Sequence, residues 1–455
     1  MPASRLSRRH LFHLAAGSVL LNAAPKRGMI VRSSRAADVE MPLEGFLEAY
    51  ITPIDRFFVR SHHYVPKVDP AAWRLEVAGK VSSPIKLSLD ELKKLPRVEL
   101  VSVLECAGNG RALYEPSMPG LQWTYGSVGN GRWAGVRLAD VLKKAGVQPG
   151  AVEVLFDGAD VPVGTQPEFQ RGIPFNKAMD PNTILAYEMN GEPLPVDHGF
   201  PLRVVVPGWA GDCWVKWLTR IEVRDTEFDG FFMKTAYRHP GKGVPPGSAV
   251  DPAKMKPVTT LQIKSLIASH ADRQDIAVAP TKLRGAAWSH ESPVAAVEVS
   301  VDGGRTWRPA RLGKENARFG WRQWEYDWTP AQEAFYTVMV RARNVAGDNQ
   351  PFAPEWNPSG YGHNVVHAVR LNATANPKPL APAAAPAPDP AMPAAVKQTC
   401  LGCHGIEGIE QQRLNRTQWE REVEKMQRWG ARVTPDNKQA IVDYLANKYP
   451  YRPRQ

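Results

Sequence analysis

The feature that most constrains the fold of this chain is an alanine- and proline-rich tract near its C-terminus. Between Asn376 and Pro393 the sequence consists almost entirely of these two residue types. Such a composition cannot bury an apolar core, and it is typical of an extended, semi-rigid spacer. It predicts a linker over 374–396 that separates a large N-terminal part from a small domain over 397–455.

The small domain carries Cys400-Leu-Gly-Cys403-His404, the attachment pattern of a c-type haem. Two thiols at this spacing can bond the two vinyl groups of one haem, and the histidine can ligate its iron. A covalent cofactor would also supply the core that so short a domain lacks. The alternative for a Cys-x-x-Cys pair is a redox-active or zinc-binding site. We expect haem c here, in a small all-α cytochrome c domain.

Met426 is the expected second axial ligand, because no other methionine follows His404. A capping box that begins at Thr417 predicts a helix in which Trp419, Val423 and Met426 share one face. A methionine on an apolar helix face is usually only part of the core. In this domain, however, haem would form most of that core.

The N-terminal residues resemble an export signal. Arg8 and Arg9 precede an apolar run from residue 11 to 24, which is shorter than the roughly 20 apolar residues of a membrane span. Paired arginines are typical of a twin-arginine signal, and the alternative is an ordinary secretory signal. We expect an export signal and processing region over 1–37, a periplasmic protein and no membrane span.

The net charge of +11 is concentrated at the two ends of the chain. Residues 1–37 carry seven basic and no acidic side chains, residues 38–396 carry 39 of each, and residues 397–455 carry 11 basic and 7 acidic ones. Because the largest block is neutral, no nucleic-acid partner is expected. The basic C-terminal domain instead predicts an acidic external electron acceptor, such as another c-type cytochrome.

Two further domains are expected before the linker. Residues 38–256 alternate short β-rich runs with short helical ones, which predicts an α+β domain. Over residues 257–373 the pattern changes: an alternating run at 297–301 leads into Asp302-Gly303, a hairpin signal, and residues 336–343 alternate again. Several short strands with little helical periodicity predict an immunoglobulin-like β-sandwich.

Two of the four cysteines are single thiols, so no disulfide scaffold is expected. Cys106 lies between glycine-rich turns, with Arg111 five residues later. A neighbouring arginine stabilises a thiolate, the form that ligates metals or attacks electrophiles, although an isolated cysteine is more often buried and inert. Cys213 is expected to be a structural thiol.

The motif around Cys106 and several others resemble the sulfite oxidase family of molybdenum enzymes, from about Phe57 to Leu371. The order and length of the matching segments make the resemblance specific. It implies a molybdopterin-binding sulfite oxidase fold over 38–256 and a dimerisation domain over 257–373, hence a homodimer. The matching segments are Leu104–Arg111, Phe57–His62, Ala186–Gly191, Asp197–Arg203 and Val215–Leu218.

The resemblance also implies roles for individual residues. Cys106 would be the thiolate ligand of molybdenum, whose other sulfurs come from molybdopterin. A soft thiolate suits this metal, and arginine forks suit a dianionic oxyanion, although a surface salt bridge is the commoner role of a single arginine. The residues expected to bind substrate are Arg60, Arg111 and Tyr237, and those expected to hold the pterin and its phosphate are His62, Asp160, His198, Arg203 and Lys216.

Two segments depart from the family pattern. Residues 356–364 match a segment that often supplies another substrate arginine, but they contain none. We expect His363 to take this role when protonated, so that anion affinity would fall as pH rises. Animal members carry Arg and His before Val-Lys-Trp, where this chain has Cys213 and Trp214.

The resemblance therefore implies a periplasmic sulfite dehydrogenase. It would oxidise sulfite to sulfate and pass electrons through the haem at His404 to an external acceptor. One alternative is another chemistry of the family, namely a sulfane dehydrogenase of thiosulfate oxidation or a reductase of sulfoxides or nitrate. Another is a haem electron carrier with a non-catalytic docking domain, against which the presence of Cys106, Arg60, Arg111 and Tyr237 argues.

Overall fold

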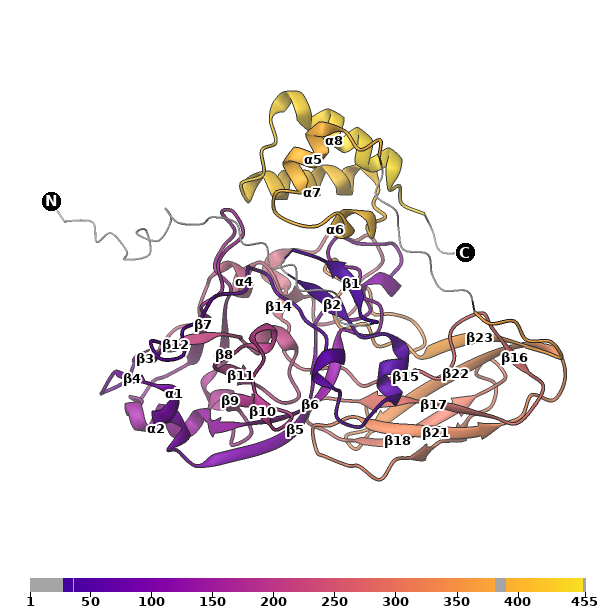
Figure 1. Cartoon of the computed structure of the whole chain (residues 1–455), viewed down its shortest axis with the longest axis horizontal. Helices are drawn as coiled ribbons and strands as arrows, with labels where there is room; N and C mark the ends of the chain where they lie inside the picture. The colour runs from indigo at the N-terminus through magenta and orange to yellow at the C-terminus, as the bar shows by residue number, and fades with distance from the viewer. Residues whose placement is uncertain (1–27, 36, 381–389, 453–455) are drawn as a thin grey trace.

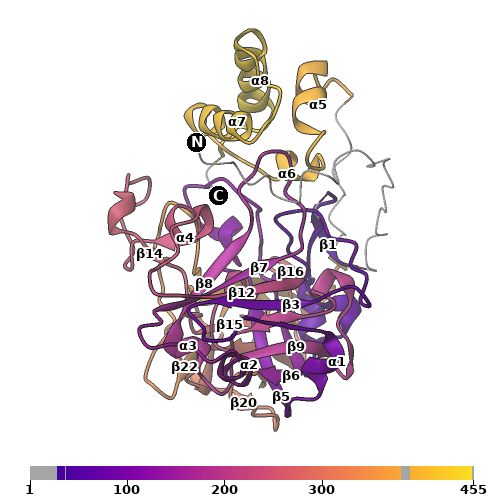
Figure 2. The same ribbon diagram turned by 90° about the vertical axis from the view of Figure 1, so that its left-hand side faces the viewer.

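The computed structural model describes residues 28–35, 37–380 and 390–452. Two sheet-rich parts lie side by side, and a small helical part covers one end of the first (Figures 1 and 2). The predicted export signal up to residue 27 and the middle of the predicted linker, residues 381–389, lie outside the described residues.

The first sheet-rich part is mixed α/β, in line with the expectation for residues 38–256. Its two five-stranded sheets follow the orders β10-β9-β6-β5, with β11 beside β9, and β4-β3-β12-β7-β8. The strands of the first sheet are β5 (Arg97–Glu105), β6 (Val128–Arg137), β9 (Ile184–Met189), β10 (Glu192–Pro193) and β11 (Arg203–Val205). Those of the second are β3 (Leu75–Gly79), β4 (Ile85–Leu87), β7 (Glu153–Gly158), β8 (Gln170–Pro174) and β12 (Leu218–Arg224).

The helices of this part are short, and local capping residues mark the start of one and the end of another. Helix α1 (Leu89–Lys93) starts at a capping box in which Ser88 and Glu91 satisfy each other's backbone N–H groups. Helix α2 (Leu138–Ala145) ends at Gly146, whose φ of 69° is accessible to glycine at little cost. The remaining helices are α3 (Phe175–Ala178) and α4 (Phe231–Lys234).

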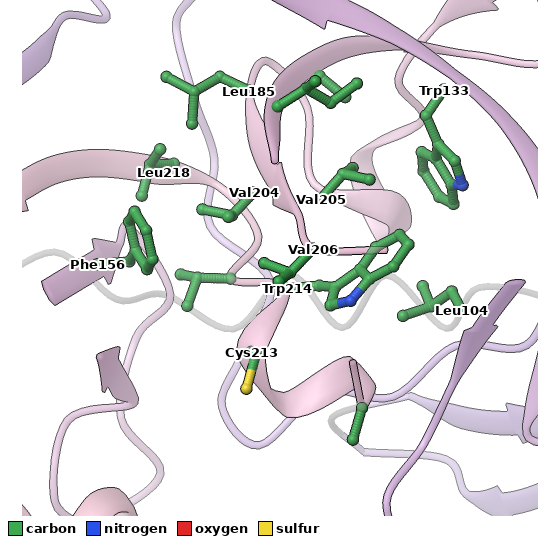
Figure 3. Close-up of a cluster of buried hydrophobic side chains, with 14 of the residues drawn as sticks. Leu104, Trp133, Phe156, Leu185, Val204, Val205, Val206, Cys213, Trp214 and Leu218 are labelled. Atoms are coloured by element: carbon green, nitrogen blue, oxygen red, sulfur yellow. The ribbon is translucent and has the colours of Figure 1, made fainter. Parts of the chain in front are cut away.

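A cluster of buried aromatic and aliphatic side chains fills the space between these elements (Figure 3). Trp133 and Trp214 pack edge to face with ring centroids 5.6 Å apart. Cys213 lies in the same cluster, has no exposed surface and is a free thiol. Burial raises the pKa of this thiol to about 12, which keeps it protonated and fits the structural role expected for it.

The second sheet-rich part consists of two sheets. Their strand orders are β15-β17-β21-β20 and β16-β23-β22-β18-β19. That this pair of sheets is an immunoglobulin-like sandwich stays a prediction. The stacked rings of Phe46 and Trp288, with centroids 6.0 Å apart, join this part to the first one. The strands are β15 (Lys264–Ile267), β16 (Gln274–Ala277), β17 (Thr281–Trp288), β18 (Val294–Ser300), β19 (Arg308–Pro309), β20 (Arg311–Leu312), β21 (Arg322–Trp328), β22 (Ala334–Asn344) and β23 (His367–Thr374).

The C-terminal part contains four helices around its own apolar core. They are α5 (Ala394–Cys400), α6 (Glu407–Glu410), α7 (Arg416–Arg428) and α8 (Pro435–Lys448). Helix α5 begins at Ala394, two residues before the predicted end of the linker at residue 396. Helix α7 begins at a capping box of Asn415 and Gln418, so the cap predicted at Thr417 was wrong. Asparagine serves the N-cap position at least as well as threonine does.

A short antiparallel hairpin precedes the first domain. It pairs β1 (Ile30–Ser33) with β2 (Asp38–Glu40), and Ser33 is 5% exposed. The predicted boundary at residue 37 is therefore too late, because residues 28–35 already belong to the folded body. Helix α6 lies beside β1 (Figure 1). Among the described residues, no helix is both long and apolar enough to cross a bilayer.

Candidate active site

Two connected cavities bring most of the predicted site residues together. A recess of about 60 Å³ lies inside the first domain, and a larger cavity of about 480 Å³ lies between this domain and the C-terminal helices. The residues that line both are Arg60, Ser61, His62, Cys106 and Tyr237. The recess also contains Asp160, His198, Arg203 and Lys216, and the larger cavity contains Arg111, Cys400, Cys403, His404 and Met426.

Cys106 stands directly after β5, on a loop held by buried ionic contacts. The Glu105 carboxylate pairs with Lys264 of β15 at 2.5 Å and accepts hydrogen bonds from Trp288 Nε1 (2.8 Å) and Asn109 Nδ2 (2.9 Å). Two of these partners come from the second sheet-rich part. Burial raises the pKa of the Cys106 thiol, while nearby arginines oppose the shift. The loop therefore presents one sulfur to the cavity in a fixed position.

Arg111 passes through a space that three glycines leave open. A Cβ atom would lie 2.8 Å from the Arg111 guanidinium if placed at Gly108, and 3.0 Å from it if placed at Gly120. At Gly360 it would lie 2.8 Å from Arg111 Cγ. Two backbone carbonyls accept hydrogen bonds from the guanidinium at 3.1 Å, and the Tyr361 ring lies 5.2 Å from its carbon. The glycine-rich motif thus gives a buried arginine access to the cavity beside the thiol.

The Arg60 side chain lines the cavity, and one nitrogen of its guanidinium group is held by Asp38. Its Nη1 donates to both carboxylate oxygens of Asp38 at 3.2 Å, and the Ser61 N–H donates to Asp38 at 2.9 Å. Burial lowers the pKa of Arg60, but Asp38, Tyr237 and Cys106 together raise it by more, so this side chain stays charged. Burial raises the pKa of Asp38 to about 6, against the opposing effect of Arg60. At neutral pH both groups remain ionised.

Tyr237 and His62 form a close pair. The Tyr237 hydroxyl lies 2.6 Å from His62 Nε2, and the imidazole stacks on Phe169 with ring centroids 4.2 Å apart. Burial and nearby cations lower the pKa of His62 well below its usual range, so the ring is neutral and Nε2 can accept the phenolic proton. Tyr237 has a φ of 54°, uncommon for a bulky residue, which fixes its direction toward the cavity.

Arg203 is a buried cation without a carboxylate partner among the described residues. It is 3% exposed, and its Nη atoms donate to the carbonyls of His198 (2.9 Å) and Trp214 (3.1 Å). Its Nε has no hydrogen-bond partner in the described part of the chain. Burial lowers the pKa of Arg203 to about 9. Burying an unpaired charge of this kind costs folding free energy unless an anion binds beside it.

Lys216 lines the same recess. Its Nζ donates to Ser61 Oγ at 3.0 Å and to the Asp197 carbonyl at 2.9 Å. Burial and the neighbouring Arg203 lower the pKa of Lys216 to about 7, and burial raises the pKa of Asp160 to about 7. A phosphate beside these cations would restore the charged form of Lys216. The recess therefore fits an anionic group, as the resemblance implies for the molybdopterin phosphate.

The C-terminal side of the larger cavity holds the Cys-x-x-Cys-His motif. His404 Nδ1 lies 3.1 Å from the Gly405 carbonyl, which leaves Nε2 available as a metal ligand. Met426 lines the cavity from α7, as predicted from the helix face. The surrounding apolar side chains include Trp419, Val423, Ile441 and Leu445. Two thiols, a histidine and a methionine around an apolar space fit a covalently bound haem.

Amide side chains form much of the contact between the two sides of this cavity. The Gln122 N–H donates to Gln411 Oε1 at 2.8 Å, and Gln412 Nε2 donates to the Gly120 carbonyl at 2.7 Å. Farther along, Gln418 Nε2 donates to a backbone carbonyl at 3.0 Å. Neutral hydrogen bonds of this kind are modest individually. They nevertheless place the haem motif over the mouth of the recess.

The structure does not bring His363 into these cavities. Its side chain packs edge to face on Tyr114, with ring centroids 5.1 Å apart, and lines a separate cavity of about 190 Å³. Tyr361 of the same segment occupies the expected place, stacked on Tyr237 at 5.4 Å. The positive φ of Gly360 (64°) turns the chain here. The prediction of His363 was therefore wrong by two positions, because Tyr361 is the residue that faces Tyr237.

Several site residues were not anticipated from the sequence. Asp38, which anchors Arg60, lies 22 residues away in the chain and belongs to no motif. Arg171 lies under the Tyr237 ring at 5.4 Å and pairs with Asp212 at 2.6 Å. One hint was present in the sequence: Asp212 directly precedes Cys213, where the chain departs from the family pattern. Among the described residues, no group of three or more His, Cys, Asp or Glu side chains has the arrangement of a metal site.

A buried thiol beside two arginines, above a recess for an anionic cofactor, defines the class of molybdopterin-binding oxidoreductases. Residues 62–232 match the family model described as oxidoreductase molybdopterin binding domain, and residues 255–374 match the Mo-co oxidoreductase dimerisation domain. Sulfite oxidase of Gallus gallus is 36% identical over 353 residues, which cover 73% of this chain and 75% of that protein. The chain belongs to the sulfite oxidase family.

Two other proteins show how far the likeness extends. Mitochondrial sulfite oxidase of Homo sapiens is 39% identical over 360 residues, 75% of this chain, and the chain spans 65% of the length of that relative. The structure of the sulfane dehydrogenase SoxCD from Paracoccus pantotrophus matches with a TM-score of 0.65 at 26% identity, over 74% of this chain and 87% of that one. The predicted sulfite oxidase fold and dimerisation domain are thus confirmed at the level of the family.

Proposed function

We propose that this protein is a periplasmic sulfite dehydrogenase that oxidises sulfite to sulfate at a molybdenum–molybdopterin site. Its electrons would leave through a c-type haem in the C-terminal helices, to an external cytochrome-type acceptor. The observation that carries the proposal is the 480 Å³ cavity, whose wall includes Cys106 and Arg60 on one side and Cys403 and His404 on the other. Substrate and haem motif share one enclosed space.

Each residue around the cavity has a defined task in this proposal. Arg60 and Arg111 bind the oxyanion, because both guanidinium groups face the cavity beside Cys106. The Tyr237 hydroxyl, whose proton the neutral His62 accepts in the structure, accepts a hydrogen bond from water or turns its proton to the bound oxyanion. The recess holds the phosphate end of the cofactor through Arg203 and Lys216.

The overall reaction converts sulfite and water into sulfate, two protons and two electrons. Cys106 would hold molybdenum together with the pterin sulfurs, and the bound metal would supply oxygen-atom transfer chemistry and accept the two electrons. The matching dimerisation domain supports a homodimer.

The second candidate is a sulfane dehydrogenase of thiosulfate oxidation. The likeness to SoxCD favours it, and so does the presence of Tyr361 where a further substrate arginine was expected. A pocket with two arginines and an aromatic ring suits a less compact sulfur anion better than a pocket with three arginines would. The two candidates share cofactor and electron path and differ only in the donor.

The decisive experiment is anaerobic mixing of the oxidised, molybdenum-replete protein with sulfite while the haem absorption is followed. Rapid reduction of the haem is the expected result. Thiosulfate and a protein-bound sulfane sulfur serve as competing donors, and faster reduction by these would favour the second candidate. Protein that binds haem but no molybdenum would contradict the proposal and would favour a haem carrier with a docking domain. Protein without bound haem would contradict both.

A further inference from the structure

The β1–β2 hairpin contacts both sides of the large cavity. From β2, Asp38 holds Arg60 of the substrate pocket and accepts the Ser61 N–H at 2.9 Å. From the turn, Arg35 reaches the C-terminal domain: its Nη1 donates to the carbonyls of Leu401 (2.7 Å) and Gly402 (3.0 Å). These two residues lie between the cysteines of the haem motif.

Other contacts surround the Arg35 contact. The Ser34 hydroxyl donates to Glu407 Oε2 at 3.1 Å, and Gln411 Nε2 donates to the Arg32 carbonyl at 2.7 Å. Helix α6 and its flanking loop therefore rest on β1 along its length. Arg35 itself lines the cavity that His404 also lines.

A buried ion pair anchors the two strands of the hairpin to each other and to the first domain. The Arg32 side chain pairs with the fully buried Glu40 carboxylate, which also accepts the Thr124 N–H at 3.0 Å and the Thr124 hydroxyl at 2.8 Å. Arg35 and Asp38 thus belong to the same hairpin, and each contacts a different side of the cavity.

We propose that Arg35 is a positioning residue for electron transfer: it holds the Cys400–His404 loop over the mouth of the substrate pocket. This inference rests on the proposed function, since it gives the loop the task of carrying haem. A hydrogen bond from a charged donor is stronger than the neutral amide contacts elsewhere in this interface. Arg35 is therefore one of the stronger contacts of this interface, together with the contacts of hydroxyl groups with the Glu407 and Glu115 carboxylates, and its loss should reduce docking of the C-terminal domain.

The test compares Arg35→Gln with Arg35→Lys and a matched control. Arg74→Gln is that control, because Arg74 also donates to two backbone carbonyls, at 2.8 and 2.7 Å, but within the first domain. Arg35→Gln should slow haem reduction by sulfite about tenfold or more, with unchanged molybdenum and haem content and an unchanged half-saturating sulfite concentration. Arg35→Lys should recover part of the rate, and Arg74→Gln all of it.

A second measurement does not need haem or turnover. The Gln122 backbone N–H donates to Gln411 across the interface, so its hydrogen exchange reports docking. Exchange at this amide should rise about tenfold in Arg35→Gln and stay unchanged in Arg74→Gln. Unchanged exchange together with an unchanged haem-reduction rate in Arg35→Gln would overturn the inference. Wild-type haem that no sulfur donor reduces would instead contradict the proposed function, while the exchange data would still decide whether Arg35 holds the loop.

Discussion

Replacing Arg203 by methionine should change the free energy of unfolding little but should weaken cofactor binding strongly. Burial lowers the pKa of Arg203 from 12.5 to about 9, and a shift of that size corresponds to about 5 kcal/mol against the buried charge. Its two hydrogen bonds to the carbonyls of His198 and Trp214 return about 3–6 kcal/mol, at about 1.5–3 kcal/mol each. The two contributions nearly cancel in protein without cofactor.

Arg203→Met should therefore leave the cofactor-free protein within about 2 kcal/mol of wild type, because methionine loses both contributions together. The loaded protein behaves differently. A phosphate beside Arg203 would recover the penalty of about 5 kcal/mol, so the variant should bind the cofactor roughly several thousandfold more weakly. Urea unfolding of protein produced without molybdenum cofactor measures the first quantity, and molybdenum content after dialysis measures the second.

Arg171→Met provides the matched control. Arg171 is equally buried, at 1% exposure, but pairs with Asp212 at 2.6 Å. Its removal leaves a buried carboxylate without its partner and should cost about 3–5 kcal/mol of unfolding free energy. If Arg203→Met destabilised the cofactor-free protein as strongly as Arg171→Met, or kept its full molybdenum content, the assignment of Arg203 to an anionic ligand would be refuted.

Three further predictions concern other parts of the molecule. Cys213→Ala should cost about 1–2 kcal/mol in urea unfolding without changing molybdenum content, because the thiol only fills the core; loss of molybdenum would contradict this. Lys216 has a folded pKa lowered to about 7 from 10.5, so the unfolded chain binds its proton more tightly, and stability of cofactor-free protein should rise between about pH 7 and 10.5. Denaturation across that range should show the rise, and cofactor-loaded protein should lack it. Haem reduction by sulfite should depend little on salt, whereas reoxidation by an acidic acceptor should slow as salt rises; stopped-flow traces at several ionic strengths would show equal slopes if this were wrong.

Local signals in the sequence account for several features of local structure. Ser88 with Glu91 and Gly146 define helix ends that the structure contains, because capping depends on residues within one turn. The spacing of Cys400, Cys403 and His404 likewise brings three groups to one cavity, since a single helix end and its loop carry them. In such cases the neighbours along the chain are also the neighbours in space.

Contacts between distant segments could not be predicted in this way. The pairing of Asp38 with Arg60 depends on how the hairpin lies across the first domain, which neither segment encodes alone. A different cause explains why Tyr361, and not the predicted His363, lies beside Tyr237. Gly360 and Gly362 both have positive φ, at 64° and 70°, so side-chain direction in this segment follows two turns rather than the alternation of a strand.

The docked arrangement has a consequence for the order of events. The C-terminal helices cover the mouth of the recess, so the arrangement that favours electron transfer also narrows the route for substrate and product. The contacts that hold it are mainly amide and carbonyl groups around Gln411, Gln412 and Arg35, which salt screens far less than ion pairs. Because many weak contacts can break and form quickly, a docked state of this kind would, under the proposed function, open for product release and close again for electron transfer, without any change in the fold of either domain.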